Sequence, residues 1–211
     1  HYPPRTRIAV SSALGQANEK NSNRDSEMTR IKPVAPEAMT EEQKRLYDKI
    51  AGQRSVPEVR GPFAVGLHAP DIGERIADMV NHLLSDTRIP HNLKELAIIV
   101  IARQYEAHYE WFIHAARAVR VGVSDEVVEA IRNRRRPDFT DEDEALVYDM
   151  TLDMVENRTL GQPLYDRAAK AFGEPGLVEL ISLIGFYVMI AVFLCAFDVD
   201  APAGGPAPLA P

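Results

Sequence analysis

Apolar residues recur at the three- and four-residue spacing of an amphipathic helix through most of the chain. The spacing is clear from residue 41 onward, where Thr40 and Gln43 form the pattern of a capping box at a helix start. A second helix is expected after Asp71, which is placed to cap it. The apolar stripe of that helix consists of Ile72, Ile76, Met79, Val80 and Leu83.

The central helices are expected at residues 87–104 and 107–122, the second ending at Gly122, a residue that suits a helix stop. The segment "LAIIVIA" at residues 96–102 is apolar on every side of a helix, so this helix should be buried on most sides. Ser124 is a good N-cap for the short helix that follows. Further helices are expected at residues 140–156, 161–173 and 176–197.

Together these segments predict about seven or eight helices with short connections, and no stretch alternates as a strand would. The expected fold class is therefore all-α, in one domain that spans residues 36–198. A flexible extension is expected at residues 1–35, most of which are polar and aperiodic. A flexible tail rich in Pro and Ala is expected at residues 199–211.

The run at residues 180–197 carries no formal charge, and its 18 residues reach the lower edge of the length that spans a membrane. Glu179 and Asp198 flank the run, and no Lys or Arg anchors either end. A helix buried in the bundle or in a subunit interface fits these flanks better than a membrane span. No membrane partner is therefore expected.

The charge balance and the cysteine count narrow the function classes. Lys and Arg total 24 and Asp and Glu total 31, so the formal net charge is −7 and provides no bulk attraction to nucleic acid. Cys195 is the single cysteine, which excludes an intrachain disulfide, a dithiol redox pair and a cysteine-rich zinc site. A single thiol fits a reducing compartment, and a cytoplasmic location is expected.

Residues 107–114 read "AHYEWFIH", which places Glu110 and His114 one turn apart on one face of a helix. Such a pair can act as a proton relay, form half of a metal site or be an ordinary surface ion pair. Spacing alone favours the surface pair. His108 lies about 200° around a helix from Glu110, so a metal site would need distant ligands such as Glu95. No metal and no other cofactor is expected.

Residues 93–131, "LKELAIIVIARQYEAHYEWFIHAARAVRVGVSDEVVEAI", resemble the carboxymuconolactone decarboxylase family. The resemblance extends to "RGPFAVGLHAP" upstream and to "RRPDF" downstream, in the family's order across residues 30–200. That family shares its fold with the alkylhydroperoxidase AhpD-like proteins. The resemblance therefore implies an AhpD-like helical bundle.

The resemblance also separates two activities. AhpD-type hydroperoxide reductases use a pair of cysteines, and the matching positions in this chain are Ala107 and Glu110. Their glutamate and histidine match Glu95 and His114. A thiol peroxidase needs one thiolate to attack the peroxide and a second thiol to resolve the product, so this activity is disfavoured. Cys195 is not expected to substitute, because a thiol in an apolar run should have a raised pKa and little access.

The decarboxylase branch implies a cofactor-free carboxy-lyase, or a related proton-transfer enzyme, acting on a small lactone or carboxylic acid. His114 would be the general acid/base, because a histidine can deliver a proton to the carbon that loses CO2. Glu110 would be the carboxylate that orients the ring, and Glu95 would be a relay partner.

Three residues are candidates for substrate binding: Arg103, His68 and Trp111. Arg103 is the nearest cation in sequence to the Glu–His pair, and it shares a face with Glu110 if one helix continues through both. His68 could instead make a backbone hydrogen bond in its loop, and Trp111 could be a core residue. Tyr187 in the last helix could likewise face the site or be a core residue.

A non-catalytic helical protein that keeps the fold remains an alternative to both enzymes. For each of these functions, the oligomers usual in the resembled family and the apolar helices imply a homo-oligomer, a trimer or hexamer. A small-molecule substrate is the other expected partner, and no nucleic-acid partner is expected.

Overall fold

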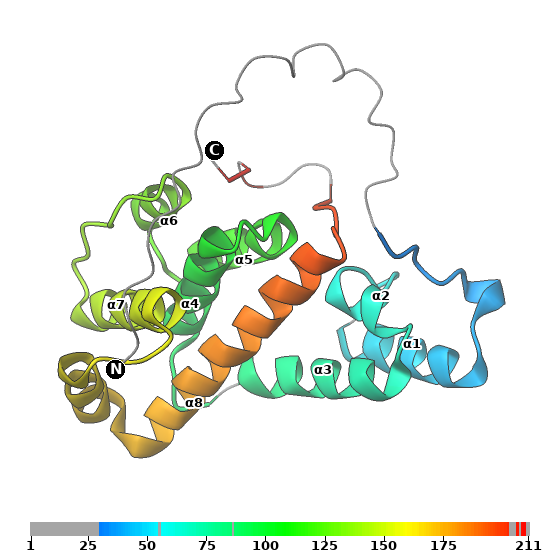
Figure 1. The fold of residues 1–211 in the computed structure, drawn as a ribbon, viewed down its shortest axis with the longest axis horizontal. Helices are drawn as coiled ribbons and strands as arrows, with labels where there is room; N and C mark the ends of the chain where they lie inside the picture. Colours follow the sequence, from blue (N-terminus) through cyan, green and yellow to red (C-terminus); the bar gives the residue numbers. More distant parts are fainter. Residues whose placement is uncertain (1–29, 55, 86, 203–205, 207, 210–211) are drawn as a thin grey trace, which may run out of the picture.

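The computed structural model describes residues 30–54, 56–85, 87–202, 206 and 208–209. Within those residues the chain forms eight α-helices, one short 3-10 helix and no strand (Figure 1). The prediction of an all-α fold is confirmed. The elements are η1 (Pro36–Ala38), α1 (Glu41–Arg54), α2 (Pro62–Gly66), α3 (Pro70–Leu83), α4 (His91–Gln104), α5 (His108–Arg120), α6 (Asp125–Arg132), α7 (Glu142–Asn157) and α8 (Gln162–Ala196).

The helices form two groups that meet along α8 (Figure 1). Helix α4 lies at the centre of the larger group, where it contacts α5, α6, α7 and α8. Every side chain in residues 96–102 is at most 1% exposed, as the all-apolar sequence of this segment predicted. Helices α1, α2 and α3 form the smaller group around a separate core that includes Leu46, Ile50 and Leu67.

Two of the three predicted helix caps are confirmed. Thr40 and Gln43 form a reciprocal capping box, with N–O distances of 2.9 and 3.3 Å. The hydroxyl of Ser124 accepts a hydrogen bond from the Val127 amide at 3.2 Å. The prediction for Asp71 is wrong, because α3 already begins at Pro70 and Asp71 lies inside its first turn.

The apolar stripe predicted for α3 is also partly wrong. Ile76, Val80 and Leu83 are buried, but Ile72 and Met79 are 49% and 44% exposed. The cause is the close approach of α2, since a Cβ at Gly73 would lie 2.5 Å from the carbonyl oxygen of Gly66. The glycine side of α3 therefore faces its neighbour, and the stripe is rotated away from Ile72.

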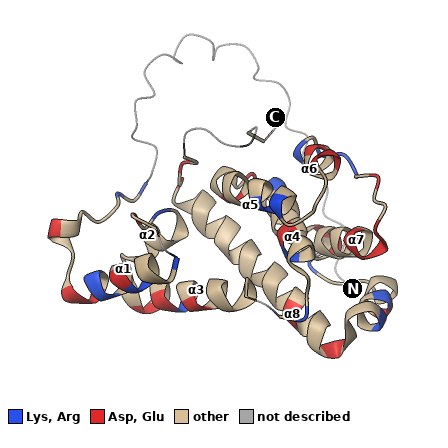
Figure 2. Cartoon of the chain, turned by 180° about the vertical axis from the view of Figure 1, so that it is seen from behind, with Lys and Arg blue, Asp and Glu red and all other residues tan. Residues whose placement is uncertain are grey.

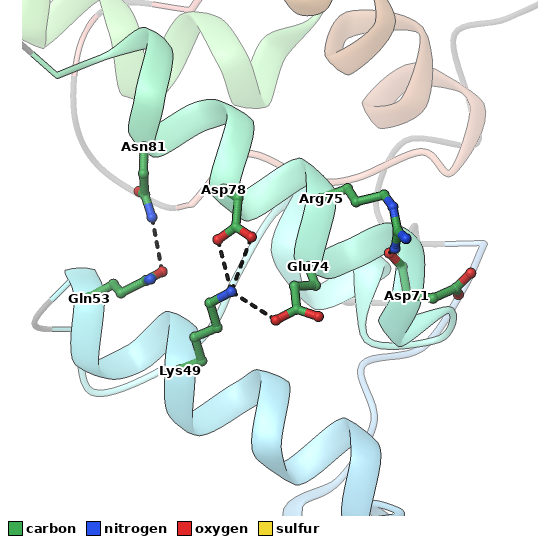
Figure 3. Close-up of polar contacts among 7 residues, drawn as sticks. All are labelled: Lys49, Gln53, Asp71, Glu74, Arg75, Asp78 and Asn81. Atoms are coloured by element: carbon green, nitrogen blue, oxygen red, sulfur yellow. Dashed lines mark hydrogen bonds and ion pairs between the residues drawn. The ribbon is translucent and has the colours of Figure 1, made fainter.

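A polar network joins α1 and α3 at the surface (Figure 3). The Lys49 ammonium donates hydrogen bonds to Glu74 at 2.8 Å and to Asp78 at 3.1 Å. Asn81 donates to Gln53 at 2.9 Å. These contacts hold the two helices together on the side that faces solvent.

Helix α8 combines two of the expected helices and bends at Gly173, where φ is 65°. Its C-terminal half carries no charged side chain from residue 180 onward (Figure 2). By length and composition it is the one helix of the described residues that could cross a membrane, and 44% of its apolar window is buried. Helix α8 as a whole packs against α2, α4, α5 and α7, as expected for a helix in a bundle.

Both ends of the described chain lie against the helices. The Arg30 amide donates to the carbonyl of Phe197 at 2.9 Å. In the segment expected to be a tail, Leu209 is 6% exposed and the Pro208 carbonyl accepts a hydrogen bond from Arg132. Most of the extension expected at residues 1–35 lies outside the described residues.

Candidate functional site

A cavity of about 360 Å³ lies where α5 and α8 meet the smaller helix group. Its polar lining comes from Arg54, Glu58, Arg60, Glu110, His114, Arg117 and Tyr187. Most of the remaining lining is apolar or aromatic, and includes Ile50, Phe63, Tyr109, Phe112, Ile190 and Leu194. A few polar groups in a mainly apolar hollow are typical of a small-molecule site.

His114 of α5 is held by a carboxylate from the neighbouring helix α4. Its Nδ1 lies 2.6 Å from Oε2 of Glu95, and the side chains of both residues are less than 9% exposed. When the Nδ1 proton is donated to this carboxylate, Nε2 is left to exchange a proton with a ligand. Tyr187 of α8 also contacts the imidazole edge-on, with ring centroids 5.2 Å apart. The histidine is therefore fixed from two sides.

Glu110 lies in the same cavity but without a hydrogen-bonding partner. The residue is 2% exposed, and neither carboxyl oxygen has a partner among the residues that the structure describes. Burial raises the pKa of Glu110 well above its ordinary value, because the charged form loses its hydration. The neutral, protonated carboxyl is therefore favoured, and it can donate a hydrogen bond to a ligand oxygen.

These positions differ in part from the contacts expected from the sequence. The surface ion pair that spacing favoured is wrong, because Glu110 and His114 are both buried. The carboxylate bonded to the ring of His114 belongs to Glu95 and not to Glu110. The i, i+4 spacing did bring Glu110 and His114 to one cavity, as helix geometry requires.

Three arginines line the cavity, and sequence reasoning missed all of them. Arg60 is paired with Glu58, whose Oε2 lies 2.7 Å from its Nε. Arg54 stacks on the ring of Phe63, with the guanidinium carbon 4.1 Å from the ring centroid. Arg117 was within reach of the sequence, because it follows His114 by three positions and so shares its helix face.

None of the three predicted substrate-binding residues lines this cavity. Helix α4 ends at Gln104 and α5 begins separately at His108, so Arg103 and Glu110 do not share the face of one helix. Arg103 is 2% exposed, and its Nη1 donates a hydrogen bond to Glu106 at 2.9 Å. Trp111 is buried in the main core.

The third, His68, is exposed, and its Nε2 lies 2.9 Å from the carbonyl oxygen of Lys32. This contact matches the backbone hydrogen bond that the sequence left open as an alternative for His68. Tyr187, by contrast, does face the cavity.

Cys195 does not line this cavity, and its Sγ donates a hydrogen bond to the Tyr105 carbonyl at 3.4 Å. Burial raises the pKa of the Cys195 thiol, as predicted, and the nearby carboxylate of Asp198 adds to the rise. The expectation of little access is wrong, since the residue is exposed. Among the described side chains, no group of three or more His, Cys, Asp or Glu is placed to hold a metal ion.

The sequence matches no protein-family model and no curated protein. Solved structures do match. An uncharacterized peroxidase-related protein from Ralstonia eutropha JMP134, an alkylhydroperoxidase AhpD core, is 12% identical over 85% of this chain and 95% of its own, with a TM-score of 0.70. A peroxidase-related protein from Silicibacter sp. TM1040 is 13% identical over 86% of this chain and 96% of its own, also with a TM-score of 0.70.

A cysteine-to-alanine variant of the debrominase Bmp8, in a complex with 2,3,4-tribromopyrrole, is 15% identical over 85% of this chain and 94% of its own, with a TM-score of 0.65. The three neighbours have different names but the same arrangement of helices. Their identities to this chain are low, so they establish the architecture and not the reaction. The chain therefore has the helical fold of AhpD-like proteins, as its resemblance to the carboxymuconolactone decarboxylase family predicted.

Proposed function

We propose that the chain is a cofactor-free acid–base enzyme that decarboxylates, or transfers a proton on, a small lactone or carboxylic acid. The observation that carries the proposal is the hydrogen bond of 2.6 Å between Glu95 and His114 beside a mainly apolar cavity. A histidine oriented by a buried carboxylate is a recurrent general acid/base.

The proposed reaction needs one proton and no redox partner. Cleavage of the bond to the departing CO2 leaves its electron pair on the substrate carbon. An imidazolium at His114 returns a proton to that carbon, and the neutral ring then regains a proton from water. Glu95 stabilises the imidazolium and fixes its ring. A neutral Glu110 can donate a hydrogen bond to the substrate oxygen on which negative charge develops.

A thiol peroxidase is the less favoured function for this cavity. The two positions that match the cysteines of AhpD-type reductases are Ala107 and Glu110. The single thiol, at Cys195, does not line the cavity that holds His114. The attacking and the resolving thiol that the peroxidase reaction requires are therefore both lacking at the site.

A purely structural role for the buried cluster is disfavoured by Glu110. A buried polar group without a partner costs about 1–3 kcal/mol of stability, so a structural protein gains nothing from this carboxyl. Destabilising groups of this kind concentrate in functional sites.

The test is the release of CO2 from carboxymuconolactone by the purified chain and its variants. The parent should turn the substrate over, and His114→Ala should lower kcat by about 10²–10⁴-fold because the proton donor is lost. Glu110→Gln should retain the shape of the site and lose part of the rate. His108→Ala is the matched control, because this histidine of α5 is exposed and lies outside the cavity.

Two outcomes contradict the proposal. If the parent releases no CO2 from the lactone, the named reaction is removed. If His114→Ala retains the parent's rate while its circular dichroism spectrum is unchanged, His114 is not the acid/base.

A further inference from the structure

Two of the three arginines in the cavity form no ion pair within the described residues. Arg60 is neutralised by Glu58. Arg54, at the end of α1, and Arg117, on α5, form no ion pair with any carboxylate in the described part of the chain. Both are only partly exposed, and both line the same hollow.

The surroundings of Arg54 make its positive charge unfavourable. Burial lowers the pKa of Arg54, and the like charge of Arg117 is the next cause. The Nε of Arg54 is also buried without a hydrogen-bond acceptor. A bound anion would relieve the repulsion and supply that acceptor.

The rest of the lining limits the shape of a ligand. Phe63, Phe112 and Ile113 offer apolar surface, and a cavity of about 360 Å³ has room only for a small molecule. Tyr109 and Tyr187 add phenol rings whose pKa values are raised by burial, so they remain neutral donors. A ligand with an anionic group on a compact apolar body therefore fits both the arginines and the apolar lining.

We propose that Arg54 and Arg117 bind the carboxylate of a small, largely apolar acid, and that they thereby place its body beside His114. The proposal rests on the proposed function only for the proton transfer at His114, since binding of the anion requires no turnover. Arg54 and Arg117 thus take the substrate-binding role that the sequence suggested for Arg103, which is buried elsewhere and bonded to Glu106. Arginine suits this role because its planar fork of N–H groups matches a carboxylate.

The experiment is a calorimetric titration of the full chain with benzoate and with its neutral analogue benzamide. Benzoate should bind at least about tenfold more tightly than benzamide. Arg54→Gln and Arg117→Gln should each weaken benzoate binding about tenfold or more, and should leave benzamide binding unchanged. Arg45→Gln on α1 and Arg120→Gln on α5 are matched controls, because both arginines are exposed and neither lines the cavity.

The proposal is overturned if benzoate binds no more tightly than benzamide, or shows no heat up to about 10 mM, a concentration well above ordinary site affinities. It is equally overturned if both glutamine variants bind benzoate like the parent. Arg54→Lys and Arg117→Lys guard against misfolding, since they retain the charge and should retain part of the preference for benzoate over benzamide.

The two proposals fail in different ways. The chain could bind benzoate through the arginines and yet release no CO2 from carboxymuconolactone. That result would support the anion site and contradict the named reaction. Turnover that persists unchanged in both glutamine variants would retain the reaction and remove the anion site. His114→Ala should still bind benzoate, because the two arginines remain in place.

Discussion

The ionic contact between α1 and α3 and the one between α4 and α5 lie in different surroundings. Lys49 with Glu74 and Asp78 joins α1 to α3 at the surface, where water screens each charge (Figure 3). His114 with Glu95 joins α5 to α4 in the interior. The exposed cluster is of a kind that contributes little to stability. The buried pair lies beside a cavity, where the low local dielectric strengthens its hydrogen bond.

Removing one carboxylate from each cluster gives the largest expected contrast. Glu95→Gln should lower turnover by about 10–100-fold, because the ring loses the partner that orients it and stabilises its charged form. Glu74→Gln should leave turnover unchanged, since its partner Lys49 lies outside the cavity. Steady-state CO2 release from carboxymuconolactone measures both. Equal rates of CO2 release in the two variants would contradict a catalytic role for the buried cluster alone.

Gly61, at the start of α2, gives a second contrast. Gly61 has φ 61° and ψ −136°, and a Cβ there would lie 2.3 Å from the ring of Tyr109. Gly61→Ala should therefore cost about 1–3 kcal/mol of unfolding free energy and disturb the cavity. Gly52→Ala is the control, because a Cβ at that helical position would meet no atom within 4 Å beyond its own stretch of helix. Urea unfolding curves compare the two, and an unchanged midpoint for Gly61→Ala would contradict the close packing.

Protonation of Glu110 supplies a third, pH-dependent contrast. Its pKa is raised on folding, so the folded chain binds more protons than the unfolded chain between the two pKa values, and stability falls as pH rises through that interval. Glu110→Gln cannot ionise and should lack this loss. The stability gained by the variant over the parent should therefore grow from about pH 4 upward. Thermal melting from pH 4 to 8 tests this, and a difference that stays constant with pH would contradict a buried neutral carboxyl.

The smallest effect is expected at the surface. Lys49→Gln removes both ion pairs of the exposed cluster, and the nearby Glu74 and Asp78 raise the pKa of Lys49. Since these side chains remain in water, the melting temperature should change little, and less at high salt than at low salt. A large loss of stability that is independent of salt would show that the α1–α3 contact depends on this lysine.

Much of the fold could be predicted because its signals are local. The capping box at Thr40 and the all-apolar segment at residues 96–102 each depend on neighbours a few positions away. The orientation of α3 depends on the contact of Gly73 with Gly66, and no periodicity within α3 reports that contact. The stripe that included Ile72 therefore failed where packing between helices decided the outcome.

The same limit applies to the site. Helix spacing placed Glu110 and His114 at one cavity, and it would have added Arg117 as well. Arg54 comes from another helix group, more than fifty positions earlier in the chain, and nothing in its local sequence marks it. The contact of His114 with Glu95 rather than with Glu110 follows from the packing of α4 against α5, which the spacing within α5 does not contain.

The central claim is that Glu95 and His114 act as one unit, and a double variant tests it most directly. The measurement is kcat for CO2 release from carboxymuconolactone by the parent, Glu95→Gln, His114→Ala and the double variant. If the two residues act together, the double variant should be no slower than His114→Ala alone. A parent without turnover, or a double variant whose loss equals the product of the two single losses, would contradict the account.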